Sequence, residues 1–264
     1  MSNKLSLFTI PKLSYRVWNV WKRNKDVFMK TYKTNFLPSI LEPVLYLLAL
    51  GLGLGGFVQA INGQPYINFI APALVAVSMM YSSFYECTYA SFVRMYYQKT
   101  FDAIIATPVT IEEVITAEIL WGATKSLINS TIVLAVIVAV GLVPSSLFLL
   151  IPPLSFLVGL LFSTIAMCFT AIIPSIDAFN YPGFLFISPM FLLSGTFFPI
   201  TSMPEILQAA AQIFFPLTNA VIVTRSLALG NIQLSILLNL AWMIILTPVF
   251  FVLAINLMKK RLIK

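Results

Sequence analysis

Residues 234–258, LSILLNLAWMIILTPVFFVLAINLM, form an uncharged apolar run that is followed directly by Lys259, Lys260 and Arg261. A helix needs about 20 predominantly apolar residues to cross the hydrocarbon core of a bilayer. Five more runs reach that length, at 39–58, 66–92, 113–142, 147–173 and 178–200. The sequence therefore predicts an all-α, polytopic membrane protein with six transmembrane helices.

The composition excludes several other classes of protein. With 59% hydrophobic and 9% charged residues, the chain cannot be arranged as a water-soluble globule. The net charge of +7 does not indicate nucleic-acid binding, because the basic residues lie at the flanks of the runs. Histidine is absent, which removes the commonest metal ligand and general base. We expect no enzyme active site, no metal site and no cofactor in this chain.

The basic flanks predict the orientation in the membrane. The first 34 residues hold eight Lys or Arg and the last six hold four. Because basic segments stay on the cytoplasmic side, both termini are expected there. This divides the chain into a cytoplasmic N-terminus (1–38), a transmembrane domain (39–258) and a cytoplasmic tail (259–264).

Residues 14–33 are too charged to cross the bilayer. On a helical wheel, Trp18 and Trp21 share a face with other apolar residues, while Arg23 belongs to the opposite face and Lys25 blurs the pattern. This pattern predicts an amphipathic helix that lies along the cytoplasmic surface. The alternative is a basic tail with scattered aromatic residues.

Three sequence pairs match the capping box, in which a Ser or Thr and a Glu three residues later satisfy each other's backbone N–H groups. They are Ser39 with Glu42, Thr110 with Glu113, and Ser202 with Glu205. Each predicts the start of a helix, and each gives its glutamate a structural role.

The segment 203–230 is apolar but interrupted. Its two halves, 204–215 and 217–229, are each too short to span a membrane, and Pro216 separates them. A re-entrant pair of short helices before the last crossing is therefore expected. With the preceding loop, this hairpin is the candidate external gate, comprising Gly195, Phe197, Phe198, Pro199, Pro216 and Arg225.

Two glycine-containing motifs imitate nucleotide-binding sequences. Gly51, Gly53 and Gly56 fit G-x-G-x-x-G but end a membrane helix and follow no strand. Lys125 and Ser126 resemble the end of a phosphate loop, but no glycine precedes the lysine. We expect no ATP site in this chain.

Glu86, Glu118 and Lys125 lie within the predicted crossings, and Arg94 and Asp177 lie at their borders. Ionisable groups are costly in hydrocarbon, so they are expected to face the protein interior or water. One interpretation is a charge-paired scaffold between the second and third crossings, and the other is a proton or ion path. Runs 147–173 and 234–258 contain no carboxylate, which weakens proton-coupled transport.

Several stretches carry a family resemblance: ECTYASFVRMYYQKT at 86–100, EILWGATK at 118–125, PSIDAF at 174–179, LSGTFFP at 193–199, PLT at 216–218 and RSLALG at 225–230. They resemble the permease subunit of bacterial ABC-2 type exporters. The chain is most similar to permeases of nodulation-factor (lipo-chitooligosaccharide) exporters, and less so to drug and polysaccharide export permeases.

This resemblance implies a homodimer in the lipid bilayer of a bacterial inner membrane, driven by two copies of a separate ABC ATPase that binds ATP and Mg. The cargo would be an amphipathic or glycan- or lipid-linked compound. The segment 94–110 would contact the ATPase, with 18–25 as a second contact; the expected coupling residues are Arg94, Gln98, Lys99, Thr100, Phe101 and Asp102. A proton-coupled exporter of small hydrophobic compounds and a membrane scaffold without transport activity remain the alternatives.

Overall fold

The computed structural model describes residues 9–57, 60–61 and 63–263. The α-helices are α1 (Arg16–Tyr46), α2 (Tyr66–Tyr85), α3 (Thr100–Ile105), α4 (Ile111–Ala139), α5 (Ile151–Ile172), α6 (Asn180–Pro182), α7 (Ser188–Leu193), α8 (Glu205–Phe214), α9 (Pro216–Leu229) and α10 (Ser235–Leu262). Over these ranges the structure has no strand beyond one isolated bridge between Ile61 and Gln64. The predicted all-α class is confirmed for the described part of the chain.

Short helices of other types join or extend these elements. Four π-helical segments cover Leu47–Leu54, Glu86–Ala90, Val93–Tyr97 and Gly183–Ile187, and 3-10 turns cover Ser146–Leu150, Asp177–Phe179 and Ile200–Ser202. Two of the π-helical segments prolong α2 toward α3. Such segments are rare in proteins and occur frequently at functional sites.

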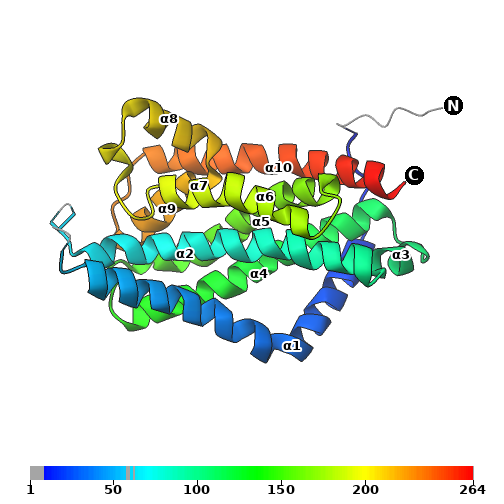
Figure 1. The fold of residues 1–264 in the computed structure, drawn as a ribbon, viewed down its shortest axis with the longest axis horizontal. Helices are drawn as coiled ribbons and strands as arrows, with labels where there is room; N and C mark the ends of the chain where they lie inside the picture. The colour runs from blue at the N-terminus through cyan, green and yellow to red at the C-terminus, as the bar shows by residue number, and fades with distance from the viewer. Residues whose placement is uncertain (1–8, 58–59, 62, 264) are drawn as a thin grey trace.

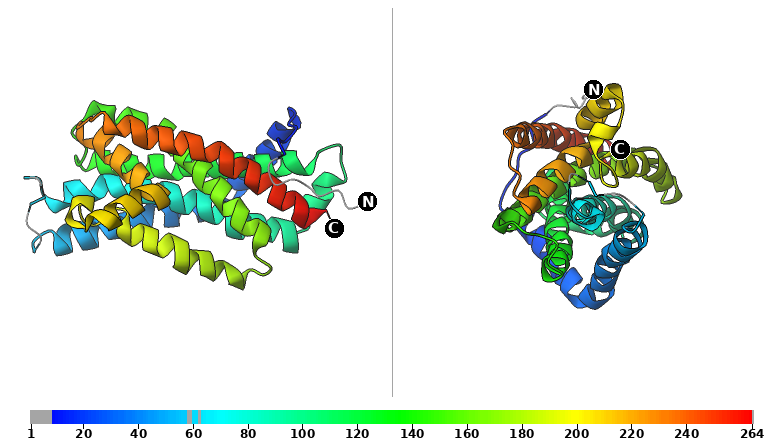
Figure 2. Two further views of the ribbon diagram at one scale, coloured as in Figure 1. Left: turned by 90° about the horizontal axis from the view of Figure 1, so that it is seen from above. Right: turned by 90° about the vertical axis from the view of Figure 1, so that its left-hand side faces the viewer.

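The long helices run side by side, and the connections gather at the two ends of the bundle. Figure 1 shows α3 at one end and α8 at the other, and the start of α1 and the end of α10 lie at the α3 end. There Asn256 of α10 donates a hydrogen bond to the Thr9 carbonyl over 2.9 Å. Figures 1 and 2 also show that α1 bends sharply near its middle.

Four helical stretches of the described chain are long and apolar enough to cross a membrane: Tyr66–Tyr97, Ile111–Ala139, Ser146–Ile172 and Ser235–Leu262. The bent pair α8 and α9 would make a fifth if it counts as one span. The predicted runs 39–58 and 178–200 are not among them. The first is divided between α1 and a π-helical segment, with some residues outside the described part, and the second is broken into four short helices.

The break at Pro216 is sharp. Helices α8 and α9 meet at 95°, with Phe215 in extended conformation between them. Proline lacks the backbone N–H that would continue the first helix, and it is well tolerated at the start of the second. The predicted pair of short helices is present, at Glu205–Phe214 and Pro216–Leu229.

One of the three predicted caps is confirmed. Thr110 and Glu113 form a complete capping box at the start of α4. The second prediction is wrong, because α8 begins after Pro204 without a side-chain cap and the Ser202 hydroxyl bonds the Pro199 carbonyl. The third pair, Ser39 and Glu42, does not start a helix, because α1 continues through both residues. Their side chains are not among those that the structure describes.

Helices α2, α4 and α5 pack closely against one another where small residues lie at their contacts. A Cβ atom on Gly159 of α5 would lie 2.9 Å from the Cα of Ala123 in α4, and one on Gly122 would lie 2.7 Å from the sulfur of Cys87. The Ser126 hydroxyl lies 3.1 Å from the carbonyl oxygens of both Met79 and Ser155. Close backbone approach of this kind is typical of packed membrane helices.

The N-terminal half of α1 differs from the predicted amphipathic helix. Its buried residues are Val20 and Asn24, and this face packs against α4. Trp18 is half exposed, whereas Trp21 donates a hydrogen bond to Thr124 of α4 over 3.0 Å. The segment is therefore part of the helical bundle on one side, and the residues predicted to share a membrane-facing side are divided between exposed and packed positions.

Candidate functional site

Four charged side chains meet where the end of α2 crosses α4. Arg94 Nη2 lies 2.8 Å from Glu86 Oε1 and 2.6 Å from Glu118 Oε2. Lys125 Nζ lies 2.7 Å from Glu86 Oε2. The structure thus brings four of the five predicted intramembrane and border charges into one cluster, Lys125–Glu86–Arg94–Glu118, which we call the charge cluster. The fifth, Asp177, is exposed and is not part of it.

Both carboxylates of the charge cluster are buried, with 4% of Glu86 and 1% of Glu118 exposed. A buried carboxylate is tolerated only when cations and hydrogen-bond donors surround it. Glu118 accepts further hydrogen bonds from the Ser91 hydroxyl over 2.5 Å and from Asn24 Nδ2 over 2.8 Å. Glu118 of α4 therefore accepts hydrogen bonds from both α1 and the extension of α2.

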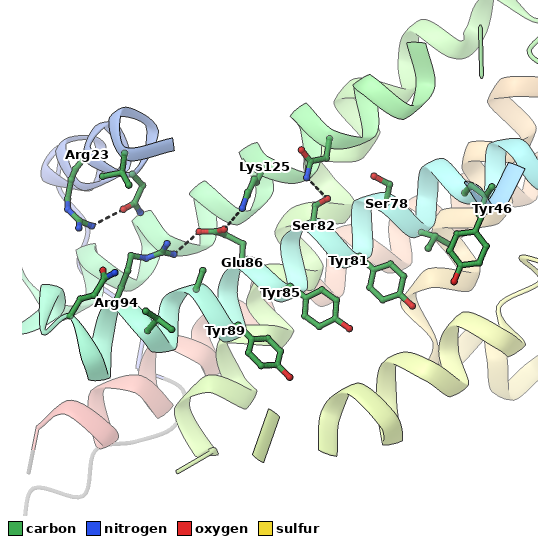
Figure 3. Close-up of a pocket in the computed structure, with 18 residues that line it drawn as sticks. Arg23, Tyr46, Ser78, Tyr81, Ser82, Tyr85, Glu86, Tyr89, Arg94 and Lys125 are labelled. Carbon is green, nitrogen blue, oxygen red and sulfur yellow. Dashed lines mark hydrogen bonds and ion pairs between the residues drawn. The ribbon is translucent and has the colours of Figure 1, made fainter. Parts of the chain in front are cut away.

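Arg23 extends the charge cluster on the side of α1. Its Nη1 donates to the side-chain oxygen of Asn24 over 3.0 Å. Within the described part of the chain it makes no ion pair with a carboxylate. Figure 3 shows Arg23 approaching the same region as Arg94 from a different helix.

A groove of about 700 Å³ starts at the charge cluster and runs along α2, between α2, α1 and α4. Figure 3 shows the rings of Tyr81, Tyr85 and Tyr89 on one side of α2, with Tyr46 of α1 at the far end. Tyr81 and Tyr85 are stacked, with ring centroids 5.5 Å apart and planes 3° apart. The spacing of four residues places these rings on one face of the helix.

The contacts of the groove continue toward the loop before α8. Phe191 of α7 packs against Tyr81 with centroids 5.9 Å apart, and against Phe197 with centroids 4.9 Å apart. On the other side, Tyr89 contacts Phe179, which contacts Phe92. A continuous series of aromatic contacts therefore joins the loop at Phe197 to the α3 end of the bundle.

The predicted coupling residues are divided by the structure. Lys99 adopts a left-handed conformation with φ of 52° just before α3, and its side chain and that of Asp102 are 66% and 62% exposed. Gln98 lines the groove and is also exposed. Phe101 is fully buried, so its predicted place on the contact surface is wrong for this structure. The apolar side of the short helix α3 holds it against the bundle.

Arg225, one of the predicted gate residues, is half-buried and binds another of them. Arg225 of α9 donates to the carbonyl oxygens of Gly195 and Phe69, over 2.9 and 3.1 Å, and its guanidinium lies 3.7 Å from the centre of the Phe69 ring. Gly195 has φ of +76°, a conformation that favours glycine.

The loop before α8 is tied to α2 a second time. The Tyr66 hydroxyl donates to the Phe197 carbonyl over 3.0 Å. Phe198 is exposed, Pro199 is partly buried, and Pro216 is buried as the first residue of α9. The structure places these residues together at the α8 end, opposite α3 (Figure 1).

Around the predicted second contact, Trp18 and Trp21 are stacked with centroids 4.2 Å apart. Lys25 is exposed and lies 3.7 Å from Asp26. Sequence reasoning did not single out Asn24, Ser91 or the groove. The spacing of Tyr81, Tyr85 and Tyr89 was a visible signal of the groove, whereas nothing in the sequence pairs Asn24 with Glu118.

Comparison with known proteins agrees with this architecture. The sequence pattern of the ABC-2 type transporter family matches residues 15–229. The chain belongs to this family, and it is a multi-pass membrane protein and a transport permease rather than an enzyme.

Among its relatives, Nodulation protein J of Rhizobium meliloti (strain 1021) is 34% identical over 259 residues, covering 98% of both chains. Nodulation protein J of Sinorhizobium fredii (strain NBRC 101917 / NGR234) is 33% identical, covering 93% of this chain and 95% of the relative. A more distant relative, Inner membrane transport permease YadH of Escherichia coli (strain K12), is 20% identical, covering 74% of this chain and 76% of the relative. The family resemblance seen in the sequence is thereby confirmed.

Proposed function

We propose that this chain is the membrane-spanning subunit of an ATP-driven exporter that moves an amphipathic or glycan- or lipid-linked compound out of the cytoplasm or the inner leaflet. The observation that carries this proposal is the family match over residues 15–229, together with full-length similarity to Nodulation protein J. The lack of a phosphate-loop sequence supports a separate ATPase chain.

The proposed assembly is a homodimer with two copies of an ABC ATPase, embedded in the bacterial inner membrane. Both termini would be cytoplasmic, with six crossings in each subunit and α8 and α9 as the re-entrant pair. The start of α1 and the end of α10 lie at the same end of the bundle (Figure 1). This supports an even number of crossings, because only an even number returns the chain to the side from which it started. The ATPase subunits would bind ATP and Mg.

The proposed coupling surface is the exposed turn around Lys99 and Asp102 at α3. The residues just before this turn are fixed in the bundle: Met95 is buried, and Arg94 forms ion pairs with both Glu86 and Glu118. A push on α3 would therefore move the end of α2 and the middle of α4 together. The aromatic contacts from Phe92 to Phe197 offer a packed route from that end to the loop before α8. The motion would open and close the seam between the two protomers.

The coupling surface is tested by replacing Asp102 with Asn in proteoliposomes that contain the chain and its ATPase. Hydrolysis should continue while export per ATP falls several-fold, with unchanged abundance in the membrane. Glu205→Gln is the matched control, because it removes one exposed carboxylate at the opposite end of the bundle. Equal export by wild type and Asp102→Asn would show that the coupling assignment is wrong.

A proton-coupled exporter of small hydrophobic compounds is the second candidate. Apart from Glu113, which caps α4, the buried carboxylates of the described spans are Glu86 and Glu118. Each of these two contacts at least one cation. Such pairing favours a structural role over proton exchange. Transport by the purified chain without an ATPase, abolished by a protonophore, would establish this alternative and overturn the ATP-driven proposal.

A further inference from the structure

The cationic end of the groove has more positive than negative groups. Arg23, Arg94 and Lys125 line it, and the carboxylates within reach are Glu86 at its surface and Glu118 beneath. The five groups together carry a net charge of +1. An unbalanced cation at the edge of the hydrocarbon is costly, and a bound anion would offset it.

The unbalanced charge is best assigned to Arg23. Arg94 and Lys125 each contact a buried carboxylate within 2.8 Å, whereas Arg23 makes no ion pair with the described residues and donates a hydrogen bond to the amide oxygen of Asn24. Arg23 is half-buried on the groove side of α1, so its guanidinium is available to the groove and partly shielded from bulk water. A guanidinium binds a phosphate group through paired hydrogen bonds.

Along the groove the lining side chains change from apolar to aromatic to charged, in the same order as the layers of one membrane leaflet from its centre to its surface. The residues of α2 and its π-helical extension that line the groove pass from Leu74 and Val77 to the tyrosines and then to Glu86 and Arg94. From Leu74 to Tyr85 is about 16 Å along a helix, close to half of the roughly 30 Å hydrocarbon core. Tyrosine is the residue expected between hydrocarbon and headgroups.

From these observations we infer that the groove holds one anionic phospholipid. Its phosphate lies beside Arg23 and Lys125, and an acyl chain follows Tyr85 and Tyr81 toward Leu74. The volume of about 700 Å³ is within the range of small-molecule sites. A soluble anion would occupy only the charged end and would leave the apolar end without a partner. The inference concerns binding alone and does not depend on export or on an ATPase.

The test uses the purified full-length chain in micelles that contain equal amounts of phosphatidylglycerol and phosphatidylcholine, with retained lipid counted by native mass spectrometry. Wild type should retain one phosphatidylglycerol per chain in preference to phosphatidylcholine. Arg23→Gln should lower that preference roughly fivefold. Arg23→Lys keeps the charge and should preserve most of it, which separates loss of the cation from a change in folding.

Lys25→Gln is the matched control, because it removes the same charge two residues away at an exposed position. The control should leave the preference unchanged. Equal retention of the two lipids by wild type would overturn the inference, as would an equal loss in Lys25→Gln and Arg23→Gln. Displacement of phosphatidylglycerol by millimolar inorganic phosphate would also overturn it, since the site would then recognise a free anion.

Discussion

Asn24 Nδ2 donates a hydrogen bond to Glu118 Oε1 over 2.8 Å, and both side chains are buried. This bond joins the first half of α1 to the first third of α4, two helices whose other contacts there are mainly aromatic. Because Glu118 also binds Arg94, the bond connects α1 to the part of the chain that leads to α3.

Replacing Asn24 by Leu should destabilise the protein through this bond. The substitution removes a donor from a buried carboxylate, and an unsatisfied buried group costs about 1–3 kcal/mol. The thermal unfolding midpoint in detergent should fall accordingly. Asn19→Leu, at an exposed position on the same helix, should change it little. An equal effect of the two substitutions would contradict the assigned role of the bond.

The charge cluster should show strong coupling between Glu86 and Lys125. Glu86→Gln leaves Lys125 without its carboxylate, and Lys125→Gln leaves Glu86 with Arg94 alone, so each should cost about 3 kcal/mol of unfolding free energy. The double variant removes both charges and should cost clearly less than the two single variants together. Additive effects in this double-mutant cycle would show that the pair is not coupled.

Close packing of α4 and α5 predicts a large effect of a single methyl group. Gly159→Ala places a Cβ atom 2.5 Å from the Ser126 Cβ and 2.9 Å from the Ala123 backbone, so the helices must separate, at about 1–3 kcal/mol. Gly183→Ala meets no atom within 4 Å and has no positive φ, so it should be neutral. Unfolding midpoints of the two variants check the contrast, and a neutral Gly159→Ala would disprove the packing.

Arg225 should control the order of the loop at 194–199. Arg225→Gln removes the guanidinium that binds the Gly195 and Phe69 carbonyls, so amide hydrogen exchange in that loop should increase. Arg225→Lys keeps the charge but cannot hold both carbonyls with a planar fork, and should give an intermediate rate. Lys99→Gln, an exposed cation at the α3 end, serves as the control and should leave loop exchange unchanged. Unaltered exchange in Arg225→Gln would exclude this role.

Local sequence signals predicted the features that depend on neighbouring residues. The Thr110 and Glu113 capping box, the break at Pro216 and the apolar runs of α2, α4, α5 and α10 all follow from spacing and residue type. The same kind of signal failed at Ser202, because Pro204 is itself the N-cap of α8, so the helix starts two residues later than the capping box requires, and the Ser202 hydroxyl donates to the Pro199 carbonyl instead.

The site depended on contacts between distant residues. Helical spacing placed Glu118 and Lys125 on one side of α4, but their partners come from α2 and from Asn24, some 94 residues earlier in the sequence than Glu118. Phe101 was expected on the contact surface because the family resemblance assigned the whole segment to the ATPase, yet this ring is buried on the inner side of α3. Tertiary packing of this kind has no local sequence signature.

The contact of α1 with α4 also gives the protein an optical reporter. Of its four tryptophans, Trp18, Trp21 and Trp121 form one group at this contact, with centroid separations of 4.2 and 6.1 Å, and Trp242 is the fourth. Three of the four indoles therefore lie at this contact, and the packing of Trp21 on Trp121 depends on α1 remaining against α4. With Trp242 replaced by Phe, an unlabelled sample would signal the departure of α1 in real time.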